Sequence, residues 1–253
     1  MQVHESTVCR TVYKVTAIIA SLHTSYITMP KEEEQQDICT AFFSKAGIPG
    51  VVGAIDCTHI PIRFHGQRKE PVYINRHGYS SINCQMVCDH DLRFLNVLAR
   101  WAGSTHDARI FNNSCLKSSL EEGLYCGVLM GDHGYPLRRY LLMPVHNPST
   151  PSELRYNRSH KKARTHIERA FIILKQCFSC LSFGLRTSAV RASSIIMACA
   201  VLHNLAINWD EPPVPHPRHS THTGCFDTVL IGPQQVQIRE GVVFRRSIID
   251  NHF

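Results

Sequence analysis

The sequence predicts an α/β fold in which a mixed sheet is flanked by helices. Two observations predict it. Short apolar or alternating runs, typical of strands, gather in residues 51–131, and longer runs with apolar residues three and four apart stand on both sides. A chain that passes from helix to strands and back to helices favours a sheet covered by helical layers.

The first expected element is a helix. Residues 7–22 place apolar side chains at helical spacing, and Ser6 is a suitable N-cap. Residues 23–48 are mixed and acidic in the middle, so we expect a surface helix or a linker there. The apolar run 51–55 then predicts a buried strand that ends at Asp56.

A hairpin and a further strand follow. Residues 82–88 and 94–101 alternate in polarity, and the segment 89–91 between them predicts the turn. A helix is expected from residue 103 to about residue 120, and residues 127–131 are expected to form a buried strand. Helical spacing returns over two long stretches, 153–177 and 190–208.

Composition excludes several classes of protein. With 43% hydrophobic and 19% charged residues, the chain is not wholly disordered. The longest apolar run is the eight residues 195–202, well short of the roughly 20 that cross a bilayer. We find no signal peptide, and the odd number of cysteines, 11, argues against a secreted disulfide framework, so we expect an intracellular protein. The net charge of +7 favours a polyanionic partner.

Three carboxylates stand at positions suited to metal binding. Asp56 and Asp132 each end an expected strand, and Glu168 lies in the middle of an expected helix. Strands that end at the same sheet edge would bring the two aspartates together, and a helix packed there would add Glu168. Such hard oxygen ligands suit Mg²⁺ or Mn²⁺, the ions of two-metal phosphoryl chemistry.

Each acid also has a structural interpretation. Ser104 and Asp107 have the spacing of a capping box, and on the sequence alone we favour capping for Asp107. Asp132 is a plausible turn residue, Asp56 a plausible strand end, and Glu168 is spaced to pair with Arg164 on one helix. The joint pattern favours the metal site.

A basic segment supports a nucleic-acid partner. Residues 155–191 hold nine Lys and Arg and one acid, Glu168. Lys161, Arg164 and Lys175 share a helical face with it, and we predict that these three contact DNA. The alternative is a basic face that serves only solubility.

Five segments carry a family resemblance. They are GAIDCTHIPI (53–62), YINRHGYSSINCQMVCD (73–89), GSTHDARIF (103–111), GDHGYPLRRYLLMP (131–144) and YNRSHKKARTHIERAFIILK (156–175). Together they resemble the PIF/Harbinger transposase superfamily of DDE endonucleases, and within it the domesticated, transposase-derived nucleases. The resemblance covers roughly residues 1–209.

The resemblance implies an RNase H-like DDE nuclease fold and divalent-metal-dependent cleavage of DNA phosphodiester bonds, without transposition. It places metal ligands at Asp56, Asp107, Asp132 and Glu168, and catalysis at Asp56, Asp132 and Glu168. For Asp107, the resemblance therefore favours metal binding over helix capping. It also implies a Myb/SANT-like DNA-binding partner and a location in nucleus and cytoplasm.

The resemblance also divides the chain. Residues 1–22 would be the remnant of an N-terminal helix-turn-helix, 23–48 a linker or helix, and 49–209 the nuclease domain. The proline-rich residues 210–253 are expected to be a weakly ordered tail. Two departures, Ile172 where the family usually has Gly and the less basic run 176–180, weaken the case for DNA contacts at that helix end.

Two competing hypotheses remain. The chain could be a DNA-binding or scaffold protein with a vestigial nuclease site, which Mg²⁺-dependent nicking would discriminate. It could also be a zinc module built on the pairs Cys177 and Cys180, or Cys84 and Cys88, but their spacing does not match a zinc finger. Buried thiols explain these cysteines better.

Overall fold

The computed structural model describes residues 4–63, 70–209 and 235–253. Its centre is a five-stranded mixed sheet with the strand order β3-β2-β1-β4-β5. The strands are β1 (Val51–Pro61), β2 (Ser81–Cys88), β3 (Phe94–Ala102), β4 (Val128–Met130) and β5 (Leu141–Leu142). Strands β1, β2 and β3 run antiparallel, whereas β4 runs parallel to both β1 and β5. The expected mixed sheet is therefore confirmed.

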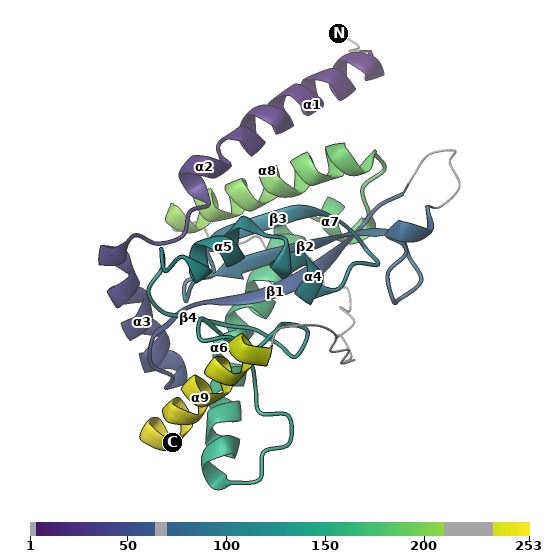
Figure 1. The fold of residues 1–253 in the computed structure, drawn as a ribbon. Helices are drawn as coiled ribbons and strands as arrows, with labels where there is room; N and C mark the ends of the chain where they lie inside the picture. Colours follow the sequence, from purple (N-terminus) through teal and green to yellow (C-terminus); the bar gives the residue numbers. More distant parts are fainter. Residues whose placement is uncertain (1–3, 64–69, 210–234) are drawn as a thin grey trace.

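Helices surround this sheet, as Figure 1 shows. They are α1 (Glu5–Ser21), α2 (His23–Tyr26), α3 (Glu32–Ala46), the 3-10 turn η1 (Pro71–Tyr73), α4 (Asp107–Asn112), α5 (Cys115–Glu121), α6 (Pro151–Cys177), α7 (Cys180–Phe183), α8 (Ala189–Asn208) and α9 (Gln235–His252). The expected α/β architecture, a sheet flanked by helices, is thus present in the described residues.

Alternation along β2 explains how two layers of helices share one sheet. Ile82 and Met86 point to the face covered by α6 and α8, whereas Val87 points to the face covered by α4 and α5. Every residue of β2 is buried, as expected for a strand with helices on both faces. Helix α8 is long and apolar enough to cross a membrane, but it packs on β2 and β3 as a core helix does.

Two expected boundaries were wrong. Strand β1 does not end at Asp56 but runs on to Pro61, because β2 continues to pair with it as far as Ser81. The expected helix 103–120 is two short helices, and the hydroxyl of Ser114 caps the second by accepting the N–H of Lys117. The expected hairpin turn between β2 and β3 is confirmed.

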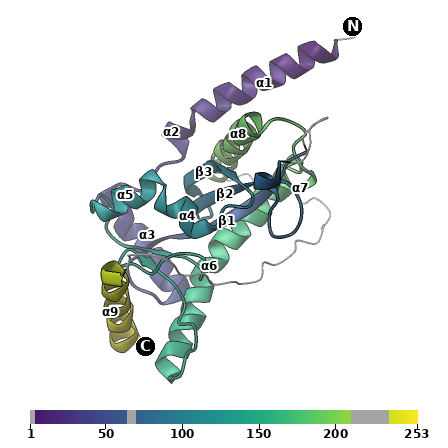
Figure 2. The same ribbon diagram turned by 45° about the vertical axis from the view of Figure 1, so that its right-hand side comes forward.

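The expected weakly ordered tail was wrong for its last part, since residues 235–252 form α9. Ile248 and Ile249 of this helix are buried in a cluster with Leu142 and Tyr156. Figure 2 shows α9 lying beside α6. Long-range apolar contacts therefore order a segment whose local pattern is weak. Residues 210–234 of the expected tail lie outside the described part of the chain.

Helix α1 extends away from the sheet layers in both views (Figures 1 and 2). None of its described residues is buried, and it contacts the rest of the chain through α8. The guanidinium of Arg191 lies 4.9 Å from the ring centroid of Tyr13, a cation–π contact between the two helices. Its predicted origin in a helix-turn-helix stays a prediction.

Candidate metal centre

The unequal lengths of β1 and β4 create the site. Strand β4 ends at Met130, which pairs with Ala54, while β1 continues for seven residues beyond Ala54. The edge of β1 beside Asp56 is therefore not covered by β4. The chain that leaves β4 carries Asp132 into this position.

Three carboxylates meet at this edge. One oxygen from each of Asp56, Asp107 and Asp132 lies within 4.8 Å of the other two. Asp56 comes from β1, Asp107 is the first residue of α4, and Asp132 follows β4. Three oxygen ligands at this separation can hold a hard divalent cation. Among the described residues, this is the one group of acids, histidines or cysteines with such spacing.

Hydrogen bonds fix each aspartate. Asp56 Oδ1 accepts the N–H of Cys57 at 2.8 Å, and Asp132 Oδ1 accepts the N–H of Gly134 at 2.9 Å. Asn83 Nδ2 donates to Asp107 Oδ1 at 3.1 Å and to the carbonyl of Thr105 at 2.9 Å. Asp132 therefore serves the turn that we considered for it and also faces the other two acids.

The capping interpretation of Asp107 was wrong. Helix α4 begins at Asp107, and its N-cap is His106, not Ser104. The Ser104 hydroxyl instead donates to the carbonyl of Val72 at 2.7 Å. Asp107 is thus free to face the other two aspartates, as the family resemblance implies.

Burial and crowding raise the pKa of two of the three acids, Asp56 and Asp107. Burial is the main cause that raises the pKa of Asp56 to about 7; Arg164 opposes this rise, and Asp132 and Asp107 add to it. Burial and the nearby Asp132 also raise the pKa of Asp107. A cluster of this kind is stabilised by a bound cation, which favours the charged form of each carboxylate.

The structure does not bring Glu168 into the cluster. Arg164 Nη2 lies 2.5 Å from Asp56 Oδ2 and 3.8 Å from Glu168 Oε1, so the guanidinium stands between the two acids. The Glu168 side chain is 53% exposed, and its expected pairing with Arg164 is present. Burial would lower the pKa of Arg164, but Asp56, Asp132 and Glu168 together raise it. Metal binding by Glu168 stays a prediction.

The three expected DNA-binding residues have different environments. Lys161 is exposed on α6, whereas Arg164 is half-buried against Asp56. Lys175 Nζ donates to Thr58 Oγ1 at 2.7 Å and to the carbonyl of His59 at 3.2 Å, and burial lowers its pKa. Lys161 is therefore the most accessible of the three, and DNA contact by each remains a prediction.

Sequence reasoning missed a group of residues that surround Asp107. Besides Asn83, these are Cys57 and Tyr135, whose Sγ and OH lie 3.2 Å apart. The Cys57 thiol also bonds the Asp107 carboxylate, and burial is the main cause that raises the pKa of both Cys57 and Tyr135. Asn83, Cys57 and Tyr135 all lie within the five segments that carry the family resemblance, and this position was the sequence feature that could have identified them.

His59, three residues after Asp56, is a structural neighbour of the site. Its Nδ1 lies 3.0 Å from Ser81 Oγ. Burial, with Arg76, Lys175 and His77 nearby, lowers the pKa of His59 to about 4, so the ring is neutral near pH 7. A neutral histidine bonded to a serine hydroxyl fits a packing role.

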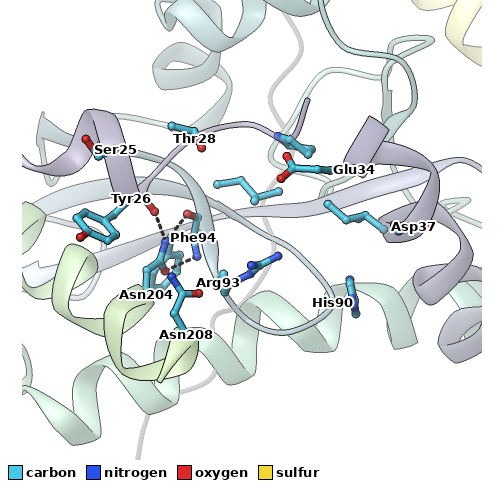
Figure 3. Close-up of a pocket in the computed structure, with 13 residues that line it drawn as sticks. Ser25, Tyr26, Thr28, Glu34, Asp37, His90, Arg93, Phe94, Asn204 and Asn208 are labelled. Carbon is cyan, nitrogen blue, oxygen red and sulfur yellow. Dashed lines mark hydrogen bonds between the residues drawn. The ribbon is translucent and has the colours of Figure 1, made fainter. Parts of the chain in front are cut away.

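Two other features lie apart from the aspartates. The cysteines of the zinc hypothesis do not converge in the described residues: Cys84 and Cys88 are buried in β2, and Cys180 is exposed. A pocket of about 290 Å³ lies between α2, α3, the β2–β3 hairpin and α8. Figure 3 shows the side chains that line it. There the Asn204 amide bonds the carbonyls of Tyr26 and Phe94. This pocket is lined by none of the three clustered aspartates.

An α/β sheet in which Asp56 of the central strand β1 meets Asp132, after β4, and Asp107, at the start of α4, defines a candidate site for metal-dependent phosphoryl chemistry. Comparison with known proteins agrees. Residues 55–204 match the family model described as DDE superfamily endonuclease. The chain therefore belongs to the DDE superfamily endonuclease family.

Individual relatives extend this likeness over most of the chain. The protein named "Putative nuclease HARBI1" is 35% identical in Bos taurus, over 85% of this chain and 65% of that protein, and 34% identical in Homo sapiens, over 83% and 63%. "Protein ALP1-like" of Arabidopsis thaliana is 25% identical over 82% of this chain and 55% of that protein. The chain thus spans about two thirds or less of these relatives' lengths. No solved structure matches the chain.

Proposed function

We propose that this chain is a divalent-metal-dependent DNA endonuclease that hydrolyses phosphodiester bonds and does not transpose DNA. The observation that carries the proposal is the convergence of Asp56, Asp107 and Asp132 within 4.8 Å. The three carboxylates offer oxygen ligands, which suit a hard divalent cation, and such a cation would favour the ionised forms of Asp56 and Asp107, whose pKa values are raised. Family membership supports the same chemistry.

Asp56, Asp107 and Asp132 would hold one or two Mg²⁺ or Mn²⁺ ions, with Glu168 as a further candidate ligand. When bound, such an ion supplies Lewis acidity and an activated water for hydrolysis of a phosphodiester. Asn83 keeps the Asp107 carboxylate aimed at the site, and Gly134 does so for Asp132. Lys161, Arg164 and Lys175 on α6 would bind the phosphates that flank the scissile bond.

A second candidate is a vestigial nuclease that acts as a DNA-binding or scaffold protein. The position of Arg164 favours it, because its guanidinium pairs with Asp56 where a cation would bind. The exposure of Glu168, outside the aspartate cluster, points in the same direction. For either candidate we propose a Myb/SANT-like DNA-binding partner and a location in nucleus and cytoplasm, on the strength of the family resemblance.

Nicking of supercoiled plasmid in Mg²⁺, Mn²⁺ or EDTA separates the two candidates. We expect metal-dependent nicking that is lost in Asp132→Asn and Glu168→Gln. Asp91→Asn, an exposed acid at the β2–β3 turn, is the matched control and should retain activity. Salt-sensitive DNA binding without nicking in any metal, also with the partner present, would refute the nuclease and leave the scaffold.

A further inference from the structure

The segment 75–79, here called the NRHGY loop, is rigid by construction. Asn75 is only 4% exposed, and its Oδ1 accepts the N–H groups of His77 at 2.9 Å and Tyr79 at 3.4 Å. The backbone N–H of Asn75 donates to the carbonyl of Tyr79, and Gly78 supplies the positive φ of 79° that closes the turn. One buried amide therefore fixes the path of the whole loop.

This loop is fastened to the strand that carries Asp56. Asn75 Nδ2 donates to Ser81 Oγ at 3.0 Å, and the same hydroxyl bonds His59 Nδ1 at 3.0 Å. His59 follows Asp56 by three residues on β1. The NRHGY loop thus keeps a constant position relative to this edge of the sheet.

The residues just before the loop are fastened to the segment that carries Asp107. The hydroxyl of Ser104 donates to the carbonyl of Val72 at 2.7 Å. Gly103 lies so close that an added Cβ would stand 2.5 Å from the carbonyl oxygen of Tyr73. Because both ligand-bearing segments hold the loop, its exposed side chains have a fixed relation to the metal centre.

The loop presents positive charge beside the aspartates. Arg76 and His77 are exposed. Arg76 is near enough to lower the pKa of His59 and to oppose the raised pKa of Asp107. Within the described ranges, Arg76 has no carboxylate in ion-pair distance, whereas Arg164 is already paired with Asp56. Arg76 is therefore available to an external anion.

We propose that the NRHGY loop holds a backbone phosphate of the DNA substrate next to the scissile one, with Arg76 as the phosphate contact and Asn75 as the buried support. The proposal rests on the proposed function, since it names how the same site receives its substrate. Arginine suits this role because its planar guanidinium donates two parallel hydrogen bonds to phosphate.

The test measures binding of a short duplex DNA of mixed sequence in Ca²⁺, as a function of salt concentration. Loss of one phosphate contact in Arg76→Gln should lower the slope of log K against log [salt] by about 0.9 and weaken binding roughly tenfold. Arg100→Gln, an exposed arginine on β3, is the matched control and should keep the wild-type slope. Arg76→Lys should keep the slope, because it keeps the charge.

Asn75→Ala gives a second measurement, since it leaves the charge of Arg76 in place. We expect weaker binding with a retained slope at a temperature where the variant is folded. If Arg76→Gln and Arg100→Gln have equal slopes while the wild type nicks DNA, the loop proposal is overturned and the proposed function stands. If the slope depends on Arg76 but no metal gives nicking, the nuclease fails and the loop assignment stands.

Discussion

Replacing Asn83 by leucine tests how the metal centre is held together. Asn83 is 1% exposed, and its one amide nitrogen donates to both the Asp107 carboxylate and the Thr105 carbonyl. A hydrogen bond to a charged group contributes about 1.5–3 kcal/mol and a neutral one about 1 kcal/mol. Asn83→Leu removes both of these hydrogen bonds, so we expect a loss of about 2–4 kcal/mol of unfolding free energy.

For a chain of this size, about 1 kcal/mol shifts the melting temperature by roughly 2–4 °C, so Asn83→Leu should melt about 5–15 °C lower. The pKa of Asp107 should rise further, because Asn83 favours its charged form. The Mg²⁺ concentration for half-maximal thermal stabilisation should therefore increase, by roughly 10–100-fold for a residue that orients a ligand. Asn96→Leu, half-buried on β3, is the control. A melting temperature and Mg²⁺ midpoint equal to those of Asn96→Leu would refute the reasoning.

Three further predictions concern pH and packing. The pKa of Asp56 is raised to about 7 in the folded chain, so without metal the folded protein loses stability as pH rises through roughly 4–7. Thermal stabilisation by Mg²⁺ should therefore be larger at about pH 8 than at about pH 6, and equal shifts of the melting temperature would contradict this. Burial lowers the pKa of His160 to about 3, so the stability that this histidine contributes is complete above about pH 6.5 and is lost on acidification. In chemical denaturation, His160→Gln should therefore lose less unfolding free energy than the wild type between about pH 6.5 and 5. An added Cβ at Gly241 would lie 2.9 Å from the backbone nitrogen of Arg138. Gly241→Val should therefore destabilise the chain by about 1–3 kcal/mol and speed hydrogen exchange of the backbone amides in α9. The control Val242→Ala, at an exposed residue of the same helix, should do neither.

Local periodicity predicted those elements whose burial pattern is repeated along their own sequence. Alternation of polar and apolar residues predicted β2 and β3 with the turn between them, and helical spacing of apolar residues predicted the central parts of α6 and α8. It could not give α9, whose Ile248 and Ile249 are buried by β5 and α6 across about a hundred residues of chain. Nor could it give the end of β1, because that is set by where β2 stops pairing.

The candidate site was predicted in part for the same reason. The strand-end argument reached Asp56 and Asp132, although Asp56 is in the middle of β1 and meets Asp132 because β4 is short. Asp107 has the spacing of a capping residue, and nothing local shows that Ser104 turns away to bond Val72. The pairing of Arg164 with Asp56 joins residues 108 positions apart, and no local pattern reports such a contact.

Charge balance at the aspartates connects the position of Arg164 with that of Glu168. Three carboxylates this close are stabilised by a positive charge beside them. In the protein without metal, the guanidinium of Arg164 is that positive charge, and it opposes the rise in the pKa of Asp56. The same guanidinium lies 3.8 Å from Glu168, one turn further along α6. A divalent ion bound at the aspartates would compete with Arg164 for Asp56, because both neutralise the same carboxylate. We therefore expect metal binding to release the Arg164 side chain from Asp56 and, with it, to free Glu168 from its pairing with Arg164. Glu168 need not lie in the aspartate cluster before the metal binds in order to act there.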